Sequence, residues 1–154
     1  NPDDPARKAM AKCIADYAGM RSSALDDLVT IVNNAVVGTT GVDFHPRLDT
    51  SLIDEVFKKG AYTAAYSGFE GAANDGRGLG VWLRAHEVDE VDVVGIATDY
   101  CVRSTAIDAA RAGFSTRVLL DLTAGVARAS TDSALDDMRA ARCELVGDPV
   151  VKSR

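Results

Sequence analysis

The stretch Val91-Asp-Val-Val-Gly-Ile-Ala-Thr-Asp-Tyr-Cys-Val-Arg-Ser-Thr-Ala-Ile-Asp-Ala-Ala110 decides the fold of this chain. Its first six residues are mostly apolar, the pattern of a parallel strand that is covered on both faces. A tight turn follows, and then a predicted helix over residues 100–112 that ends at Gly113. This succession predicts a strand–turn–helix unit of the kind from which open α/β sheets are built.

The sequence after this unit repeats the alternation of strand and helix. We expect a strand over residues 117–121, a helix over 131–141 and a last short strand over 143–146. With the strand over 91–96, these segments make two right-handed crossover units. The predicted fold class is therefore α/β, with an open, mostly parallel sheet and helices on both faces, a three-layer α/β/α arrangement.

The sequence before residue 91 is less regular. We expect a helix over residues 5–18, a strand over 55–59 that ends at Gly60, a long loop over 60–78 and a helix over 79–86. We treat residues 1–154 as a single domain in which residues 1–35 form a divergent helical segment.

The composition is that of an ordinary globular domain. Apolar residues make up 47% and charged residues 26% of the 154 residues, which is enough to bury a full core. The net charge of −6 shows no basic excess of the kind that nucleic-acid binders carry. The apolar runs are too short to cross a bilayer, and the acidic residues 1–5 do not resemble a secretory signal. Three cysteines without a CxxC spacing favour reduced thiols, and hence a cytoplasmic protein.

Cys101 is the first candidate functional residue, because it falls in the first turn of the helix that follows the strand. Unpaired N–H groups and the positive end of the helix dipole favour thiolate over thiol. The same N–H groups can bind an oxyanion that develops on an attacked carbonyl. The alternative is that Cys101 is a small core residue, as many cysteines are. We interpret Cys13 and Cys143 as structural, since both fall in segments with apolar periodicity.

Lys59 is the best candidate for the cation that thiolate chemistry requires. It ends the predicted strand over 55–59 and precedes a glycine, so we expect its side chain at the cleft beyond the strand ends. Lys58 points the opposite way, because side chains alternate along a strand. The alternative is that Lys59 is a solvated surface lysine.

Several motifs then carry a resemblance to a known family. They are Val42-Asp-Phe-His-Pro-Arg-Leu-Asp-Thr50, Phe57-Lys-Lys-Gly-Ala-Tyr-Thr-Ala-Ala-Tyr-Ser-Gly-Phe-Glu70, Gly95-Ile-Ala-Thr-Asp-Tyr-Cys-Val-Arg103 and Val118-Leu-Leu-Asp-Leu-Thr-Ala-Gly-Val126. In this order they resemble the nicotinamidase/pyrazinamidase group of isochorismatase-like cysteine hydrolases. The resemblance covers about residues 36–147 and implies the isochorismatase-like α/β/α fold.

The resemblance implies an amidohydrolase that converts nicotinamide and water to nicotinate and ammonia through a thioester. Cys101 matches the family's nucleophile and Lys59 its catalytic lysine. Ala97 and Cys101 match the residues whose backbone N–H groups form the oxyanion hole, and the family has a cis peptide bond just before the first of them. The implied substrate-binding residues are Tyr66, Ile96 and Tyr100. The implied partners are small aromatic amides such as nicotinamide and pyrazinamide, and a homo-oligomer is possible.

The chain departs from the family in its N-terminal part. The family's catalytic Asp ends a first strand, in a motif that this sequence lacks. An ungapped alignment places Asn34 where the family has a metal-binding histidine and Ile31 at a substrate-stacking tryptophan. A second alignment makes residues 28–32 the first strand and puts Asn33 at the catalytic Asp. An amide cannot take a proton from a thiol, so neither alignment restores the chemistry.

The family also binds a divalent metal, Zn, Fe or Mn, through one Asp and three His. This sequence has two histidines, His45 and His86. Asp43-Phe-His45 looks like a metal pair, but its context matches a segment that holds no ligand in the family. We interpret His86 as a surface or helix-end residue. We therefore identify no cofactor and no metal-binding residue.

Three hypotheses follow from these observations. The first is a nicotinamidase-type amidohydrolase. The second is a catalytically degenerate member of the family that binds a ligand or a partner without hydrolysis. The third is a truncated member whose missing N-terminal portion comes from another chain or is left out of an incomplete sequence.

Overall fold

The computed structural model describes residues 44, 51, 53–60 and 65–151. The chain divides into two compact units, Asn1–Ile53 and Asp54–Arg154, and the helices and strands given below belong to the second. The helix predicted over residues 5–18 lies outside the described residues, as do Asn33, Asn34 and His45.

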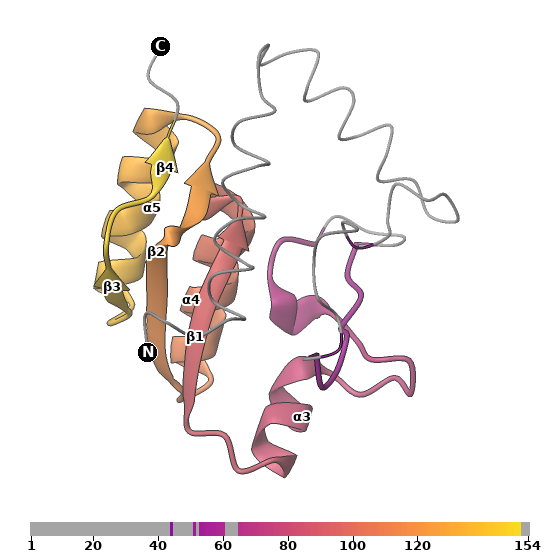
Figure 1. Ribbon diagram of the computed structural model, residues 1–154. Helices are drawn as coiled ribbons and strands as arrows, with labels where there is room; N and C mark the ends of the chain where they lie inside the picture. The colour runs from indigo at the N-terminus through magenta and orange to yellow at the C-terminus, as the bar shows by residue number, and fades with distance from the viewer. Residues whose placement is uncertain (1–43, 45–50, 52, 61–64, 152–154) are drawn as a thin grey trace. The chain divides into compact units, whose positions relative to one another are not determined.

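The second unit is built on a parallel sheet of four strands (Figure 1). They are β1 (Glu90–Ile96), β2 (Ser115–Gly125), β3 (Glu144–Val146) and β4 (Val150–Val151). The long strand β2 lies in the middle, with β1 on one side and β3 and then β4 on the other. All pairs are parallel, which confirms the predicted α/β fold with an open, mostly parallel sheet.

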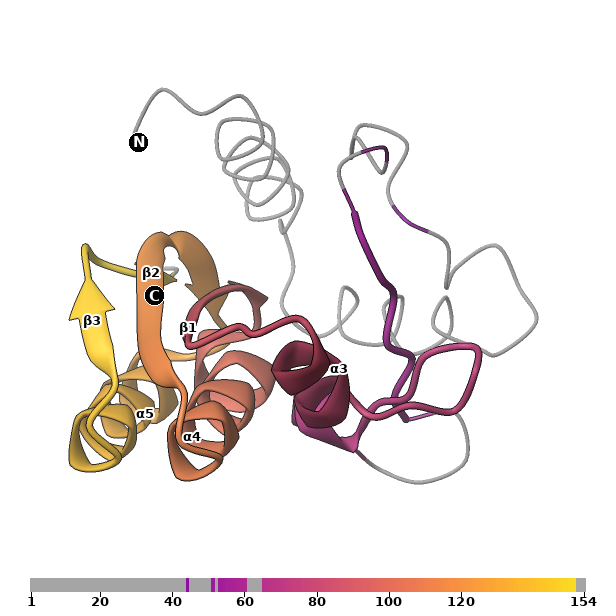
Figure 2. The same ribbon diagram turned by 90° about the horizontal axis from the view of Figure 1, so that it is seen from below.

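Two helices, α4 (Arg103–Arg111) and α5 (Arg128–Ala140), cover one face of this sheet (Figure 2). Each connects neighbouring parallel strands, and two right-handed crossovers made in the same direction place both helices on the same side. The core between helices and sheet is formed by Val93, Val102, Ala106, Val118, Leu120, Met138 and Cys143. Burial of this apolar surface is the main force that holds the layers together.

On the opposite face of the sheet, charged residues lie near the N-terminal ends of the strands. Arg117 on β2 donates two hydrogen bonds to Asp92 on β1, at 2.7 and 2.8 Å, and β3 places Glu144 beside Arg117 in the sheet register. The Asp92 carboxylate raises the pKa of Arg117 through these bonds. Both side chains are nearly half exposed, so this pair contributes little to stability. The apolar pattern of β1 therefore reflects mainly the face that packs on α4.

A shorter helical segment lies alongside α4. It consists of η3 (Gly68–Glu70), a 3-10 turn capped by Ser67, and α3 (Leu79–Ala85). Arg84 of α3 donates a hydrogen bond of 2.9 Å to the carbonyl of Ala112 and lies over the ring of Phe114. These contacts hold α3 against the C-terminal end of α4.

Two sequence predictions need correction. Residues 55–59 do not form a strand, since the described backbone makes only an isolated bridge between Lys58 and Ala72. The helix predicted over residues 100–112 is preceded and partly replaced by a π-helix, η4 (Thr98–Val102), so that Cys101 lies in the π-helix and α4 begins at Arg103.

Met138 gives a direct test of this packing. It is fully buried in the core, at 0% exposure. We expect Met138→Ala to lower the free energy of unfolding by about 2–5 kcal/mol, because it removes buried apolar atoms and leaves a cavity. Urea unfolding followed by circular dichroism measures this change. Asp136→Ala on the same helix is the matched control, since that side chain is 79% exposed. A loss for Met138→Ala no larger than for the control would contradict the packing.

Candidate functional site

Cys101 and Lys59 meet beyond the carboxyl end of β1. Ile96 ends β1, and Cys101 follows within η4, where its side chain is half-buried. The Lys59 ammonium donates to the Cys101 sulfur over 3.5 Å and to the carbonyl of Ala65 over 2.9 Å. The hydrogen bond to the Ala65 carbonyl holds the ammonium beside the sulfur. There the positive charge of Lys59 stabilises negative charge on the sulfur during nucleophilic attack.

The backbone before Cys101 has the geometry that the resemblance predicted. The peptide bond between Ile96 and Ala97 is cis. The Ala97 carbonyl accepts hydrogen bonds from the N–H groups of Tyr100 and Val102, both at 3.1 Å, which folds η4 back on the end of the strand. The oxyanion role of the Ala97 and Cys101 N–H groups remains a prediction.

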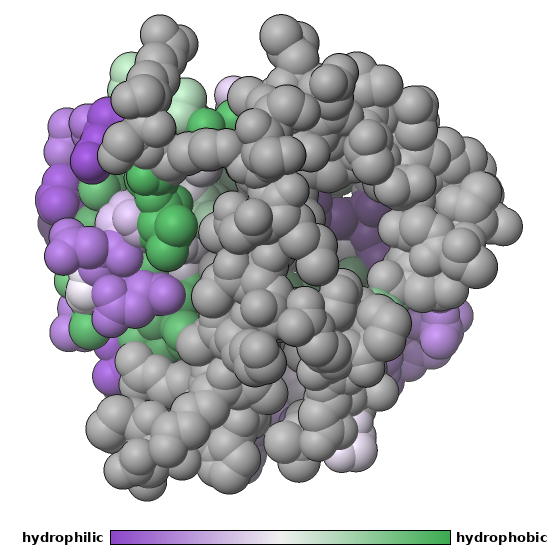
Figure 3. All heavy atoms as spheres, turned by 45° about the horizontal axis from the view of Figure 1, so that its top comes forward, coloured by the Kyte–Doolittle hydropathy of each residue, from purple (hydrophilic) through white to green (hydrophobic). Residues whose placement is uncertain are grey.

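Exposed aromatic and apolar side chains lie in Cys101's own turn and at the carboxyl end of the sheet. The rings of Tyr66 and Tyr100 lie 5.9 Å apart at an angle of 31°, and both are about half exposed, as is Ile96. Val126 and Val150, near the ends of β2 and β4, are exposed too. Figure 3 tilts the carboxyl end of the sheet toward the viewer and shows, on its left side, apolar residues bordered by hydrophilic ones. Ligands of open α/β sheets bind at this end.

Two buried polar residues anchor the turn that carries Cys101. Thr98 donates a hydrogen bond of 2.9 Å to Thr123 on β2, and both hydroxyls are fully buried. The Asp99 carboxylate, 2% exposed, accepts hydrogen bonds from the start of α5. Sequence reasoning missed Asp99. The available signal was that Ala127, at the N-cap of α5, has no side-chain acceptor. The N–H groups at the start of α5 therefore need an acceptor from another part of the chain.

The described residues do not fit the divalent metal that the resemblance implies. Among residues 53–60 and 65–151, no group of three or more His, Cys, Asp or Glu side chains is placed to hold a metal ion. His86 stacks on Trp82 with ring centroids 3.9 Å apart, and its Nδ1 donates to the Trp82 carbonyl at 2.8 Å. No step of the chemistry proposed below passes through a metal.

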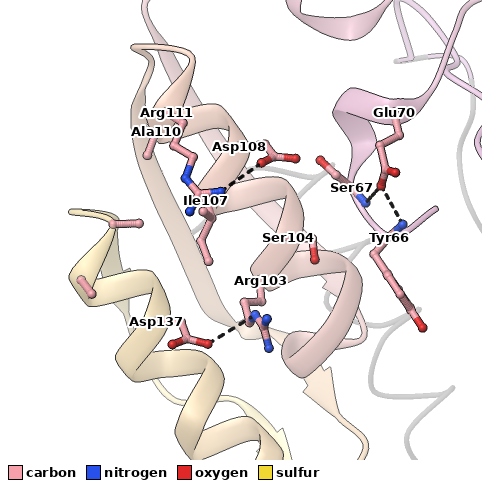
Figure 4. A pocket seen from close by; sticks show the side chains of 12 residues that line it. Tyr66, Ser67, Glu70, Arg103, Ser104, Ile107, Asp108, Ala110, Arg111 and Asp137 are labelled. Atoms are coloured by element: carbon pink, nitrogen blue, oxygen red, sulfur yellow. Dashed lines mark hydrogen bonds and ion pairs between the residues drawn. The ribbon is translucent and has the colours of Figure 1, made fainter. Parts of the chain in front are cut away.

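A separate groove of about 800 Å³ lies along the outer side of α4, between η3 and α5 (Figure 4). Its lining includes Tyr66 but not Cys101 or Lys59. Arg103 and Asp137 in its lining form an ion pair at 3.5 Å, and the Glu70 carboxylate accepts hydrogen bonds from the N–H groups of Tyr66 and Ser67. The contact between Cys101 and Lys59, and not this groove, therefore defines the candidate site.

Residues 9–148 match the Isochorismatase domain family. The chain belongs to the isochorismatase family. The match begins well before residue 36, so it also includes most of the N-terminal segment that sequence reading treated as divergent.

Most of this isochorismatase-family chain is similar in sequence to bacterial nicotinamidases. It is 64% identical over 113 residues to the nicotinamidase/pyrazinamidase of Mycobacterium tuberculosis, covering 73% of this chain and 61% of that protein. It is 38% identical over 105 residues to a nicotinamidase of Escherichia coli, covering 66% and 49%. The match thus spans 61% and 49% of the length of these two relatives.

Solved structures show the same fold. PnC1 from L. infantum, solved in complex with nicotinate, superposes with a TM-score of 0.64 at 32% identity, over 75% of this chain and 60% of that one. A nicotinamidase/pyrazinamidase of Acinetobacter baumannii gives a TM-score of 0.62 at 33% identity, over 71% and 55%. Within the described residues, no helix is both long and apolar enough to span a membrane.

Proposed function

We propose that this chain is the catalytic part of an amidohydrolase that converts nicotinamide and water to nicotinate and ammonia. The observation that carries the proposal is the 3.5 Å contact between the Lys59 ammonium and the Cys101 sulfur. The turn that carries Cys101 also holds Tyr100, whose ring lies beside that of Tyr66. The names of the relatives and the nicotinate in the L. infantum structure support the choice of substrate. Pyrazinamide, another flat aromatic amide, is the expected second substrate.

In the proposed mechanism the Cys101 sulfur attacks the amide carbonyl. The N–H groups of Ala97 and Cys101 bind the oxyanion, and Lys59 stabilises the charge on sulfur. The carbon–nitrogen bond breaks, and the proton that left the thiol departs with ammonia. Water then hydrolyses the thioester, which releases nicotinate and restores the thiol.

Tyr66, Tyr100 and Ile96 are the proposed binding surface for the pyridine ring. The two tyrosine rings are close enough to form one aromatic wall, and their faces suit a flat heterocycle. Ile96 adds exposed apolar area directly before the cis peptide bond. The site therefore selects a small aromatic amide over an aliphatic one.

The second candidate function is ligand binding without hydrolysis. One observation favours it: in the part of the chain that the structure describes, the recorded partner of the Cys101 sulfur is Lys59, and no carboxylate bonds to it. The proton transfer then depends on water or on a group outside the described residues.

Ammonia release separates the two functions. The proposed hydrolase liberates ammonia and nicotinate in equal amounts from nicotinamide over many turnovers. Absence of release, together with nicotinate binding that is lost in Cys101→Ala, would favour the binding protein. Benzamide and acetamide serve as controls for the pyridine nitrogen and the ring, and equal rates on acetamide would contradict the aromatic site.

We also propose a reducing, cytoplasmic location, because the mechanism needs a free thiol. Cys101 and Cys143 are both free in this structure. Fractionation of cells that make the chain tests the location. A homo-oligomer remains a prediction, which sedimentation analysis would decide.

A further inference from the structure

We propose that Asp99 is a positioning residue that holds the Cys101 sulfur beside Lys59. The carboxylate lies in the same π-helix as Cys101, two residues earlier, and it is 2% exposed. It makes no recorded contact with the sulfur, so it acts through the backbone of the turn. The catalytic consequence rests on the proposed function, whereas the positioning itself does not.

The Asp99 carboxylate joins the turn to the start of α5. One oxygen accepts from the Val126 N–H at 3.1 Å, and the other accepts from the Ala127 N–H at 3.4 Å and from the Ser130 hydroxyl at 2.5 Å. Hydrogen bonds to an ionised carboxylate are stronger than those between neutral groups. The bonds also supply the acceptor that the α5 N-terminus otherwise lacks, where negative charge is favourable.

The segment to which Asp99 bonds, between the end of β2 and the start of α5, is held by further contacts. A Cβ added to Gly125, at the end of β2, would collide with the Thr131 hydroxyl of α5, so the strand end and the helix start are in close contact. Thr131 also donates to the Ala127 carbonyl at 2.7 Å. On the other side of the turn, Thr98 is bonded to Thr123. Asp99 therefore connects the turn that carries Cys101 to the junction between β2 and α5.

The arrangement also keeps two opposite charges apart. A buried carboxylate near a cysteine would attract the lysine that the thiolate needs. Here its oxygens are engaged by three donors on the α5 side, and Lys59 is held by the carbonyl of Ala65 and the sulfur instead. Loss of the Asp99 bonds therefore changes the distance between sulfur and ammonium.

A double-mutant cycle between Asp99 and Lys59 tests this role. The readout is the rate at which iodoacetamide alkylates Cys101 at pH 7, measured on its tryptic peptide by mass spectrometry in folded protein. We expect Lys59→Met to slow alkylation in the wild-type background and to have a clearly smaller effect in Asp99→Asn, a coupling of about fivefold or more, as in connected networks. Ser130→Ala, which removes one donor, gives a weaker coupling in the same direction and serves if Asp99→Asn fails to fold.

A merely structural role predicts something different. It would lower the melting temperature but leave the two effects on alkylation additive, and additivity in both cycles would overturn the proposal. Asp136→Asn, on the exposed side of α5, is the control that leaves alkylation unchanged.

Turnover gives an independent reading. Because a small misplacement of the nucleophile slows the chemical step, we expect Asp99→Asn to lower kcat by about 10- to 100-fold with KM within about threefold. If the wild type releases no ammonia but the cycle shows coupling, the proposed function fails and the positioning role stands. If the wild type turns over normally but the cycle is additive, the proposed function stands and the positioning role fails.

Discussion

Replacing Cys101 with Ala is expected to abolish the hydrolysis of nicotinamide, with kcat lower by about 10⁴-fold or more, the usual effect of removing a covalent nucleophile. The sulfur is the atom that forms the thioester, and the other cysteine that the structure describes, Cys143, lies in different surroundings. Cys143 is buried in the core, and burial raises the pKa of its thiol, which makes it a poor nucleophile. Release of ammonia and nicotinate is the measurement.

Cys143→Ala is the matched control for this prediction, since it also deletes a thiol but in the core beneath α4 and α5. We expect it to reduce stability and to leave kcat of the folded protein nearly unchanged. Rapid quenching with nicotinamide should show a covalent adduct on the peptide that contains Cys101 only when that residue is present. Residual turnover of Cys101→Ala above one tenth of the wild-type rate would mean that the nucleophile is another group.

The strands and helices of the second half were predictable because their signals are local. The apolar run of β1, the glycine after α4 and the alternation that follows each lie within a few residues of the element they define. The segment 55–59 misled because its apolar residues pack instead of pairing in the sheet. Phe57 meets Trp82 edge-on, with ring centroids 5.9 Å apart, and the only bridge is that of Lys58 with Ala72.

The site was only partly predictable for a related reason. Cys101 and Lys59 are 42 residues apart in sequence, and their distance depends on the loop that brings the Ala65 carbonyl to the ammonium. The sequence pattern predicts Lys59 at the end of a strand, and the structure has no strand there. Lys59 lies beside the sulfur because its ammonium also bonds to the Ala65 carbonyl. Asp99 escaped notice because its partners belong to a helix about 30 residues later, and no periodicity records such a contact.

Lys59→Met is expected to lower kcat by about 10²- to 10³-fold, the usual loss when a charge-stabilising donor is removed from an active site. Methionine keeps most of the length and apolar stem of lysine but cannot donate to the sulfur or to the Ala65 carbonyl. Since that carbonyl directly precedes Tyr66, we also expect KM to rise, because the aromatic wall loses a support. Steady-state hydrolysis of nicotinamide measures both constants.

Lys58→Met is the matched control, because the neighbouring lysine is exposed and its recorded bridge to Ala72 uses only backbone atoms. It removes the same charge from the same segment, so a loss of activity common to both variants would point to long-range electrostatics. A loss confined to Lys59→Met assigns the effect to the 3.5 Å contact with sulfur. If instead Lys59→Met keeps kcat within threefold of the wild type, Lys59 is a solvated surface lysine and the thiolate is stabilised by the turn alone.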